Sequence, residues 1–394
     1  MRGTPTLGSP ANFASAMKTA RHPASHALTA VESLMAIALV TSALPSHVNA
    51  QGCVASPNNS ACMSMPGEHA GTSTSAHQLT GTVSYRWYES ARHFGGRTRA
   101  GTWLDGDEEN TDREKYHQQM INRVSLVDVS LSYRITARWN VTLDLPYIDA
   151  ERSSVFEHTD GKRHSMRSSG LGDVRLTTDY WLLDPHKHME GNVALGIGVK
   201  APTGDDRASD TSYRADGPVH RPVDQSIQPG DGGWGIILQL QAYQKIYQNL
   251  YGYVQGSYML TPQEHNQTET VTADMRPPGP MTLNSIGDQY FGRGGFSYLV
   301  WPAKGLTLSL GGRIEGVPVY DAIGDSLGFR QPGYTVSVEP GISWMGKKNT
   351  LSILAPVAVY RNRQRSAPEI AMGRPGGDAS FADFSILATF THHF

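Results

Sequence analysis

Apolar and polar residues alternate through the last stretch of the chain, "DFSILATFTHHF". Phe384, Ile386 and Phe390 share one parity, and Asp383 and Ser385 share the other. Successive side chains of an extended strand point to opposite faces, so a period of two predicts a strand with one apolar and one mostly polar face. The alternation continues to the final residue, and the sequence therefore predicts a terminal strand whose apolar face lies against an apolar environment.

The same alternation returns along the chain after residue 75. Val127, Val129 and Leu131, for example, alternate with Asp128 and Ser130. Each such segment is close to the ~9–11 residues that a tilted strand needs to cross a membrane. Segments of this kind lie near residues 79–88, 120–135, 139–147, 172–182, 192–202, 234–246, 249–261, 291–301, 305–316, 333–345, 350–361 and 380–394.

The connections between these segments alternate in length. After every second segment the connection is short ("TAR", "LDPHKHMEG", "QN", "PAK", "GKKN"), and the other connections are long and polar. An outer-membrane barrel has this arrangement, with tight periplasmic turns, long external loops and an even number of strands. The sequence therefore predicts an all-β protein, a transmembrane antiparallel β-barrel of about 12 strands.

Charged residues within the predicted strands fall on the polar parity. An arginine or lysine that faces lipid at the midplane costs ~2–4 kcal/mol, whereas one inside a barrel can be solvated. Such residues either line a conduction path and select solutes, or form cross-strand pairs that fill a narrow barrel. The candidates for lining the lumen are Arg86, Asp128, Arg134, Asp144, Arg175, Asp179, Lys200, Arg313, Glu315 and Glu339.

The composition excludes a helical membrane protein. The chain has 394 residues, a mean hydropathy of −0.38 and no run near the ~20 apolar residues of a spanning helix. Its 41 glycines, 17 tyrosines and low charged fraction of 18% suit a β protein with aromatic residues at the membrane interface. A formal net charge of −2 gives no reason to expect a nucleic-acid partner.

The N-terminal residues have the pattern of a secretory signal peptide. Lys18 and Arg21 precede the apolar run "LMAIALVTSAL", which the small-residue cleavage pattern of "PSHVNA" follows. The residues before Met17 are either an upstream extension or the result of a misassigned start. We expect three parts: a signal peptide (1–50), a periplasmic segment (51–77) and a barrel in the outer membrane of a Gram-negative bacterium (78–394).

The two cysteines, Cys53 and Cys62, follow the predicted cleavage site. In an exported chain such a pair is expected to form a disulfide that closes a small loop. A lipidated Cys53 is the alternative, although "AQG" before it lacks the large aliphatic residue usual three positions upstream.

Three motifs are similar to sites for a dinucleotide, a calcium ion or another metal, but the residues around each motif do not fit such a site. "GDGGWG" (230–235) matches a dinucleotide fingerprint, yet a loop precedes it and a strand follows it. The acidic stretch "LDGDEENTD" (104–112) lacks the glycine and distal glutamate of a calcium loop. His186 and His188 have no obvious third metal ligand nearby. We therefore expect neither a cofactor nor a metal.

Catalysis is an alternative because some barrels of this size hydrolyse lipids. A lipid hydrolase needs a serine, a histidine and an orienting acid or amide within reach of one another. His265 lies beside Asn266, but no serine accompanies them in a recognisable local pattern. We therefore expect a protein that is not an enzyme.

Four glycine-containing segments resemble an outer-membrane family named for the meta-pathway of phenol degradation. They are "GLGDVRL" (170–176), "GVKAPTGDD" (198–206), "QPGDGGWG" (228–235) and "PGYTVSVEPGISW" (332–344). The resemblance implies a β-barrel channel for hydrophobic or aromatic compounds, and it assigns no functional residues. Phe394, with Phe390 at the matching apolar spacing, also resembles the terminal signal that barrel-assembly machinery recognises, whereas His392 departs from that signal.

These observations predict an outer-membrane channel for passive passage of small organic solutes. Its expected partners are outer-membrane lipid, the barrel-assembly machinery and those solutes. Residues 206–230 lie in the longest connection, and we expect them to fold inward and set the bore. A non-conducting barrel whose loops bind partners and an outer-membrane lipid hydrolase are the two alternatives.

Overall fold

The computed structural model describes residues 76–96, 98–99, 117–273, 279–374 and 376–394. The expected signal peptide, the pair of Cys53 and Cys62, and the acidic stretch 104–112 lie outside these residues. Nearly all of the expected periplasmic segment lies outside them as well.

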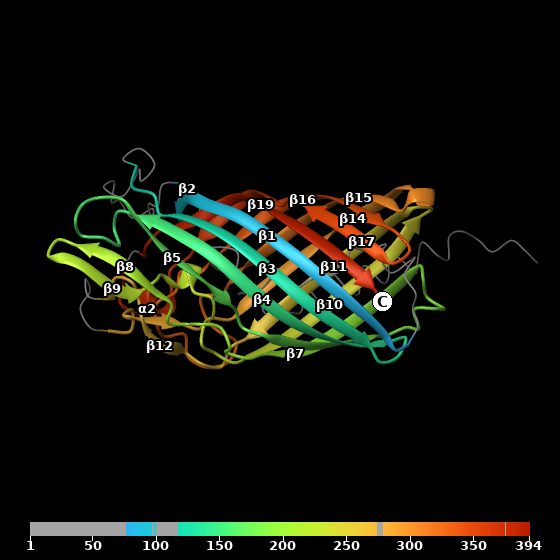
Figure 1. Ribbon diagram of the computed structural model, residues 1–394, viewed down its shortest axis with the longest axis horizontal. Helices are drawn as coiled ribbons and strands as arrows, with labels where there is room; N and C mark the ends of the chain where they lie inside the picture. Colours follow the sequence, from blue (N-terminus) through green and yellow to red (C-terminus); the bar gives the residue numbers. More distant parts are fainter. Residues whose placement is uncertain (1–75, 97, 100–116, 274–278, 375) are drawn as a thin grey trace, which may run out of the picture. The chain divides into compact units, whose positions relative to one another are not determined.

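Twelve strands close into one antiparallel barrel within the described part of the chain, as predicted (Figure 1). Two of the twelve are interrupted and carry two labels each. In order around the wall, they are β1 (Gln78–Gly95), β3 (Ile121–Arg134), β4 (Trp139–Ser154), β5 with β6 (His164–Leu171 and Arg175–Trp181), β7 (Gly191–Lys200), β10 (Gly235–Tyr247), β11 (Leu250–Leu260), β14 (Gln289–Trp301), β15 (Leu306–Val317), β16 (Gly333–Met345), β17 with β18 (Asn349–Leu354 and Val357–Arg363) and β19 (Ala379–His393).

The terminal strand closes the barrel. β19 pairs with β17 on one side and with β1 on the other, where Thr80 lies opposite His393. A barrel in lipid must pair its backbone groups in this way, because the bilayer core offers no water to unpaired N–H and C=O groups. The alternation at the C-terminus therefore ends in a strand that lipid covers on one face.

The long connections carry short elements, most of them at the barrel end opposite the C-terminus (Figure 1). No helix among the described residues is long and apolar enough to cross a membrane. The elements outside the wall are β2 (Thr98–Arg99), β8 (Ser209–Arg214), β9 (Gly217–Pro222), η4 (Gln225–Ile227), β12 (His265–Glu269), β13 (Leu283–Ser285), η6 (Pro302–Lys304) and α2 (Ala367–Ala371).

Strand β4 is longer than predicted because its polarity pattern reverses above the membrane. Leu145 and Tyr147 face outward and Asp144 inward, but beyond Tyr147 the buried Ile148 faces inward and Glu151 outward. Apolar side chains are favoured on the outside of a barrel in lipid and on its inside in water. The reversal therefore marks the outer edge of the lipid-facing band, and the predicted segment 139–147 ends there.

A small apolar core fills the barrel above this edge. Val223 and Ile227, from the long connection between β7 and β10, are fully buried in one cluster with Ile148 and Met166. η4 contacts β3 and β4, whereas the β8–β9 hairpin extends outward beyond the wall (Figure 1). Only the last part of the connection that was expected to fold inward thus enters the barrel.

Two glycines bring separate connections into backbone contact beside β5, which pairs with β4 but not with β7. A Cβ atom on Gly204 would lie 2.7 Å from the Cα of Gly230. Asp173 fastens the contact, since its Oδ1 accepts from the Gly204 N–H (3.0 Å) and its Oδ2 from the Asp231 N–H (3.1 Å). Lys200 Nζ donates to Asp173 at 3.2 Å and also contacts Asp231.

Candidate functional site

The interior charges of β1, β14, β15 and β16 form one connected network. Arg86 lies 2.7 Å from Glu315, Arg313 lies 2.8 Å from Glu315 and 3.3 Å from Glu339, and Arg293 lies 3.1 Å from Glu339. All five residues are at most 6% exposed. Arg86 and Glu315 belong to strands that are not neighbours in the wall, so their ion pair crosses the lumen.

Most of the other lumen candidates also have polar partners inside the barrel. Arg175 Nη2 donates to both carboxylate oxygens of Asp128, at 2.8 and 2.9 Å. Asp144 accepts a hydrogen bond from Ser130, and Lys200 contacts Asp173 and Asp231. Arg134 and Asp179, on β3 and β6, are half-buried.

The sequence leaves open whether the interior charges line a conduction path or form pairs that hold the barrel together, and the observed pairing favours the second. Removing one member of a buried ion pair leaves an uncompensated charge and costs several kcal/mol, so such pairs fix the strands that carry them. The network is therefore arranged as a set of interior cross-links. Its part in solute passage stays a prediction.

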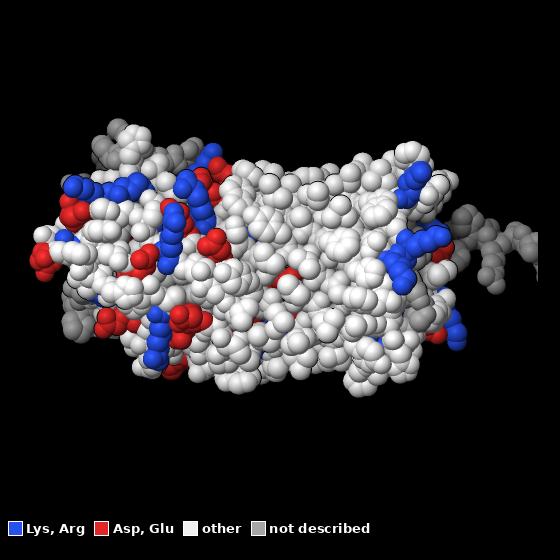
Figure 2. Space-filling model, viewed as in Figure 1, with Lys and Arg blue, Asp and Glu red and all other residues white. Residues whose placement is uncertain are grey.

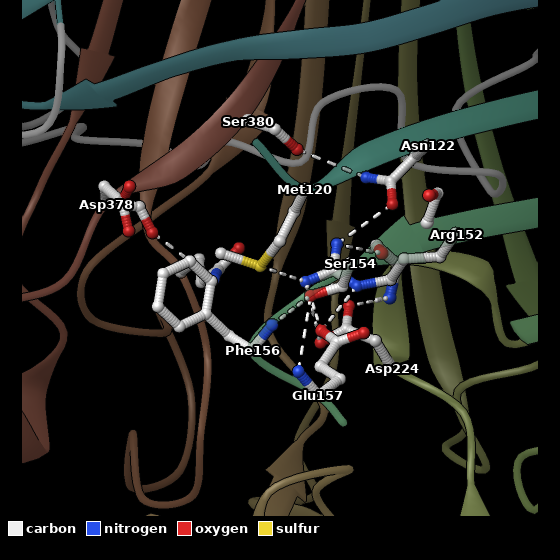
Figure 3. A network of polar contacts seen from close by, with 12 residues as sticks. Met120, Asn122, Arg152, Ser154, Phe156, Glu157, Asp224, Asp378 and Ser380 are labelled. Atoms are coloured by element: carbon white, nitrogen blue, oxygen red, sulfur yellow. Dashed lines mark hydrogen bonds and ion pairs between the residues drawn. The ribbon is translucent and has the colours of Figure 1, made fainter. Parts of the chain in front are cut away.

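A polar network anchors the inward-folded connection above the membrane edge (Figure 3). Arg152 of β4 is 2% exposed and donates from Nε to Glu157 at 2.7 Å and from Nη1 to Asn122 at 2.9 Å. Its Nη2 lies 3.7 Å from Asp224, the residue that caps η4. Asn122 also donates to Ser380 at 3.3 Å, which links the network to β19.

A histidine cluster supports the β8–β9 hairpin outside the membrane. The rings of His164 and Tyr213 are stacked 4.0 Å apart, and His158 packs against His164 at 5.0 Å. The Tyr213 N–H donates to His158 Nδ1 at 3.0 Å. Burial, with a smaller contribution from nearby His164, lowers the pKa of His158 to about 4, so this side chain is neutral at pH 7.

Besides the unpaired edge of β5, the wall is incomplete at the boundary between β18 and β19, here called the seam. β18 shares with β19 only the register pair Val357 and Phe384 within the described residues. Above this pair a side chain takes the place of the backbone ladder: Arg361 Nε donates to the Ala382 carbonyl at 3.2 Å, and its Nη2 donates to Asp383 at 2.7 Å. Next to the register pair, the Ser385 N–H donates to the Pro356 carbonyl at 3.1 Å, and β18 is paired with β16 on its other side.

The interruption between β17 and β18 has a local cause in the sequence. Pro356 lies between the two strands and has no N–H to donate to a ladder, so proline within a wall strand is confined to edges and irregular positions. The predicted segment 350–361 ran through this proline, and the proline was the available signal for the break. β5 and β6 are also separated, at Gly172–Val174 within the predicted segment 172–182, where the sequence has no proline.

A small cavity lies behind the seam. Its volume is about 10 Å³, roughly the room that one water molecule needs. The outer side of the seam is apolar and exposed, with Val357, Val359 and Phe384 at 47%, 61% and 45% exposure. The residues that line the cavity are Arg86, Tyr88, Glu315, Thr335, Ser337, Pro356, Ala358, Ala382, Phe384 and Ser385.

Three arginines of these sites were not among the sequence candidates. Arg293 lies among glycines, which obscure the alternation of β14, and Arg361 lies at the end of a predicted segment next to its loop. Arg152 lies above the membrane edge, beyond the predicted segment 139–147, where the alternation of apolar and polar positions is reversed. Parity alone would have placed Arg293 inside the barrel, but no sequence signal indicates its partner Glu339.

Among the described residues, no serine is hydrogen-bonded to any of the four histidines that contact an acid or amide side chain, which are His93, His164, His265 and His392. His93 Nδ1 lies 2.9 Å from Asp378, but its Nε2 accepts the Met120 N–H at 2.9 Å. His265 Nδ1 contacts the side chain of Gln267 at 3.0 Å. Nor do the described residues contain a group of three or more His, Cys, Asp or Glu side chains arranged to hold a metal. The motif "GDGGWG" leads directly into β10, as predicted.

The C-terminal aromatic residues face away from the lumen. Phe390 and Phe394 are 45% and 64% exposed, and the Phe394 ring packs edge-on against His392 at 4.7 Å. The Phe394 N–H donates to the Leu79 carbonyl at 3.1 Å, at the point where the barrel closes. Recognition of these residues by assembly machinery stays a prediction.

Comparison with known proteins gives matches in structure only. No family model and no curated protein matches the chain. The fold is similar to that of an outer-membrane channel from Pseudomonas putida F1, with a TM-score of 0.52 and 13% identity over 82% of this chain and 98% of that one. A FadL homologue from Pseudomonas aeruginosa (0.41, 8% identity, 88% and 96%) and the β domain of the Bordetella autotransporter BrkA (0.42, 13%, 81% and 100%) match at lower scores.

The first of these matches shows a shared fold, and the two lower scores carry no argument. Together with the closed wall and its lipid-facing band, the shared fold defines the class of this chain. It is an outer-membrane β-barrel.

Proposed function

We propose that this barrel is a passive channel for small organic solutes, including aromatic ones. The observation that carries the proposal is the seam, where an apolar outer surface meets a cavity lined by lumen residues and where Arg361 bridges the two strands above their single register pair. The shared fold with an outer-membrane channel and the resemblance to the meta-pathway family support it. The barrel itself carries out no chemical reaction in this proposal.

The proposed route runs between the lumen and the membrane through the seam. The cavity is too small for an aromatic ring while β18 and β19 are held together, so passage requires Arg361 to release the Ala382 carbonyl. Breaking this hydrogen bond costs only about 0.5–1.5 kcal/mol net, because water can replace the lost partner. The seam can therefore open transiently while the other wall strands stay paired.

The alternative of a non-conducting barrel is favoured by one observation, the paired and buried interior charges. Such a barrel would hold its strands with these ion pairs and use its long connections to bind partners. It predicts the same folded wall but no solute flux.

Liposome swelling separates the two functions. The purified chain is refolded into liposomes with sugars, amino acids and small aromatic acids as test solutes, and its folding is verified by heat-modifiable gel mobility. Swelling with a preference among these solutes is the result expected of the channel. Folded protein that leaves the liposomes impermeable to all of them would contradict it.

A further inference from the structure

We infer that the cavity behind the seam binds small aromatic solutes that carry an anionic oxygen, an inference that rests on the proposed channel function and specifies its substrate class. Arg86 lines this cavity and is only 3% exposed. Its Nη2 donates to Glu315, whereas its Nε and Nη1 have no hydrogen-bond partner. Thr335 Oγ1, in the same lining, is also buried without a partner.

Unpartnered buried donors are costly, at about 1–3 kcal/mol each and more for charged groups. A ligand oxygen that accepts from Arg86 and Thr335 would remove this cost. A carboxylate oxygen suits the site best, because a hydrogen bond from a guanidinium to an ionised oxygen is roughly twice as strong as a bond between neutral groups.

The charge of the network favours an anion. The connected interior residues comprise three arginines, Arg86, Arg293 and Arg313, and two glutamates, Glu315 and Glu339, which leaves one positive charge in excess. Asp128 on the adjacent strand β3 does not neutralise this excess by direct contact, since both of its oxygens accept from Arg175. A bound carboxylate would balance the network.

The apolar lining favours a ring. Pro356, Ala358, Ala382 and Phe384 surround the seam side of the cavity, opposite the polar groups. The cavity has room for about one oxygen atom, so the solute oxygen would occupy it while the ring lies between the strands. Binding would therefore hold the seam open, which couples recognition of the solute to its passage.

Equilibrium binding by titration calorimetry, on the folded full barrel in detergent, tests this inference without a transport step. The probes are benzoate and benzamide, which share size and ring but differ in charge. We expect benzoate to bind at least tenfold more tightly than benzamide. Arg86→Gln should abolish the preference, and Arg86→Lys should retain part of it.

Two further variants keep the test valid if Arg86→Gln fails to fold. Thr335→Val removes one donor, and Ala358→Leu fills the cavity, so both should weaken benzoate binding without changing the ion pairs. Arg134→Gln, which removes an interior arginine from another part of the lumen, is the control and should leave binding unchanged.

The outcomes separate the two proposals. Equal binding of the two probes, or an unchanged preference in all the cavity variants, would overturn the anion site. Charge-selective binding by a barrel that passes no solute would leave the anion site in place and contradict the channel instead.

A second surface, on the outside of the barrel, carries an independent inference. One row of charged residues crosses the neighbouring strands β1, β3, β4 and β5, and each member is the register partner of the next: Glu89, Arg123, Glu151 and Arg167. They form one outward row of alternating charge, in which Arg123 donates to Glu89 at 2.7 Å and Arg167 to Glu151 at 2.9 Å. Figure 2 shows charged residues of both signs gathered beyond one end of the uncharged band on this face.

The depth of the row places it at the headgroups of the outer leaflet. Two outward positions further toward the membrane on the same strands lie Tyr85, Val127, Tyr147 and Leu171, which begin the lipid-facing band. The two arginines are 55% and 73% exposed despite their glutamate partners. Neighbouring strands are about 4.8 Å apart, so the arginines, two strands apart, present cationic groups about 10 Å from each other.

The geometry points to phosphorylated glycolipid of the outer leaflet as the partner of this row. Guanidinium groups bind phosphate oxygens in pairs, and a repeat of about 10 Å suits a headgroup with more than one phosphate. Exposed ion pairs stabilise a protein by only about 0–1 kcal/mol, so stability alone is a weak reason for four of these residues to align.

Binding of bisphosphorylated lipid A by the folded barrel in mixed micelles, measured by native mass spectrometry, tests this surface. Replacement of both Arg123 and Arg167 by Gln should reduce binding at least tenfold, and replacement by Lys should restore part of it. The control removes two charges at the opposite rim, Lys347→Gln with Lys348→Gln, and should have no effect. Unchanged binding in the arginine variant, or equal binding of phosphatidylglycerol, would overturn the inference.

Discussion

At the scale of the residue, Arg361 decides how tightly the seam is closed. We expect Arg361→Ala to raise solute flux several-fold, because it removes the hydrogen bond to the Ala382 carbonyl that substitutes for the backbone ladder. Stability should fall by about 1 kcal/mol, the usual net contribution of one hydrogen bond. Liposome flux and thermal unfolding measure the two effects.

Arg92→Ala is the matched control for this prediction. Arg92, on β1, also pairs with Asp383, at 2.9 Å, but β1 is already joined to β19 by register pairs from Thr80 to Phe94, with two register shifts between Tyr88 and Arg92. The Arg92→Ala variant should lose a similar ion pair without changing the solute flux. Equal flux in the two variants would show that the seam is not the route.

His158 makes the outer hairpin sensitive to acid. Its pKa in the folded protein is about 4, mainly because of burial, against an ordinary value near 6.5. A lowered histidine pKa means that the unfolded segment binds more protons between these values. The stability of this region is therefore full above about pH 6.5 and falls as the pH drops toward 4.

Hydrogen exchange of the amides in β8 and residues 155–159 checks this dependence. Exchange should be faster at pH 5 than at pH 7 after correction for the intrinsic rate, and His158→Gln should remove most of the difference. His220→Gln, at an exposed position of β9, is the control. A pH dependence that survives in His158→Gln would assign it to another group.

At the scale of the element, three of the four segments of the family resemblance meet at one point of the wall. They contribute Asp173, Gly204 and Gly230, which form the contact that closes the wall beside β5. The resemblance gave these segments no role, and their separation in sequence gave no sign of a contact. The structure supplies a reason for their glycines, since neither backbone can approach the other with a Cβ between them.

We expect Gly204→Ala to destabilise the barrel by about 1–3 kcal/mol, the usual effect of overpacking, because its Cβ would meet backbone atoms that cannot move aside alone. Gly312→Ala, where a Cβ would have nothing within 4 Å, should leave stability nearly unchanged. The measurement is the temperature at which the folded band is lost on heat-modifiable gels. Equal temperatures for the two variants would contradict the close contact.

Strand position could be predicted where lipid imposes the alternation, and less well where it does not. The segment 333–345 matches β16 at both ends, because its outward residues all meet lipid. β4 continues past Tyr147 because water replaces lipid there and the pattern inverts. Within the candidate site, parity indicated that Arg86 and Glu315 face inward, but their pairing across the lumen depends on barrel closure, which no local pattern encodes.

At the scale of the whole molecule, a closed wall and a filled interior leave the seam as the proposed path. The wall follows from alternation, from the connection lengths and from the terminal strand that joins β1. The path could not be predicted from the sequence, because it depends on which strands fail to pair.

The most direct test compares aromatic-acid flux through three folded barrels in liposomes: the unmodified chain, Arg361→Ala and Ala358→Leu. We expect the fastest flux for Arg361→Ala, which loosens the seam, and the slowest for Ala358→Leu, which fills the cavity behind it. Equal flux through all three barrels, or none through any, would contradict passage through the seam.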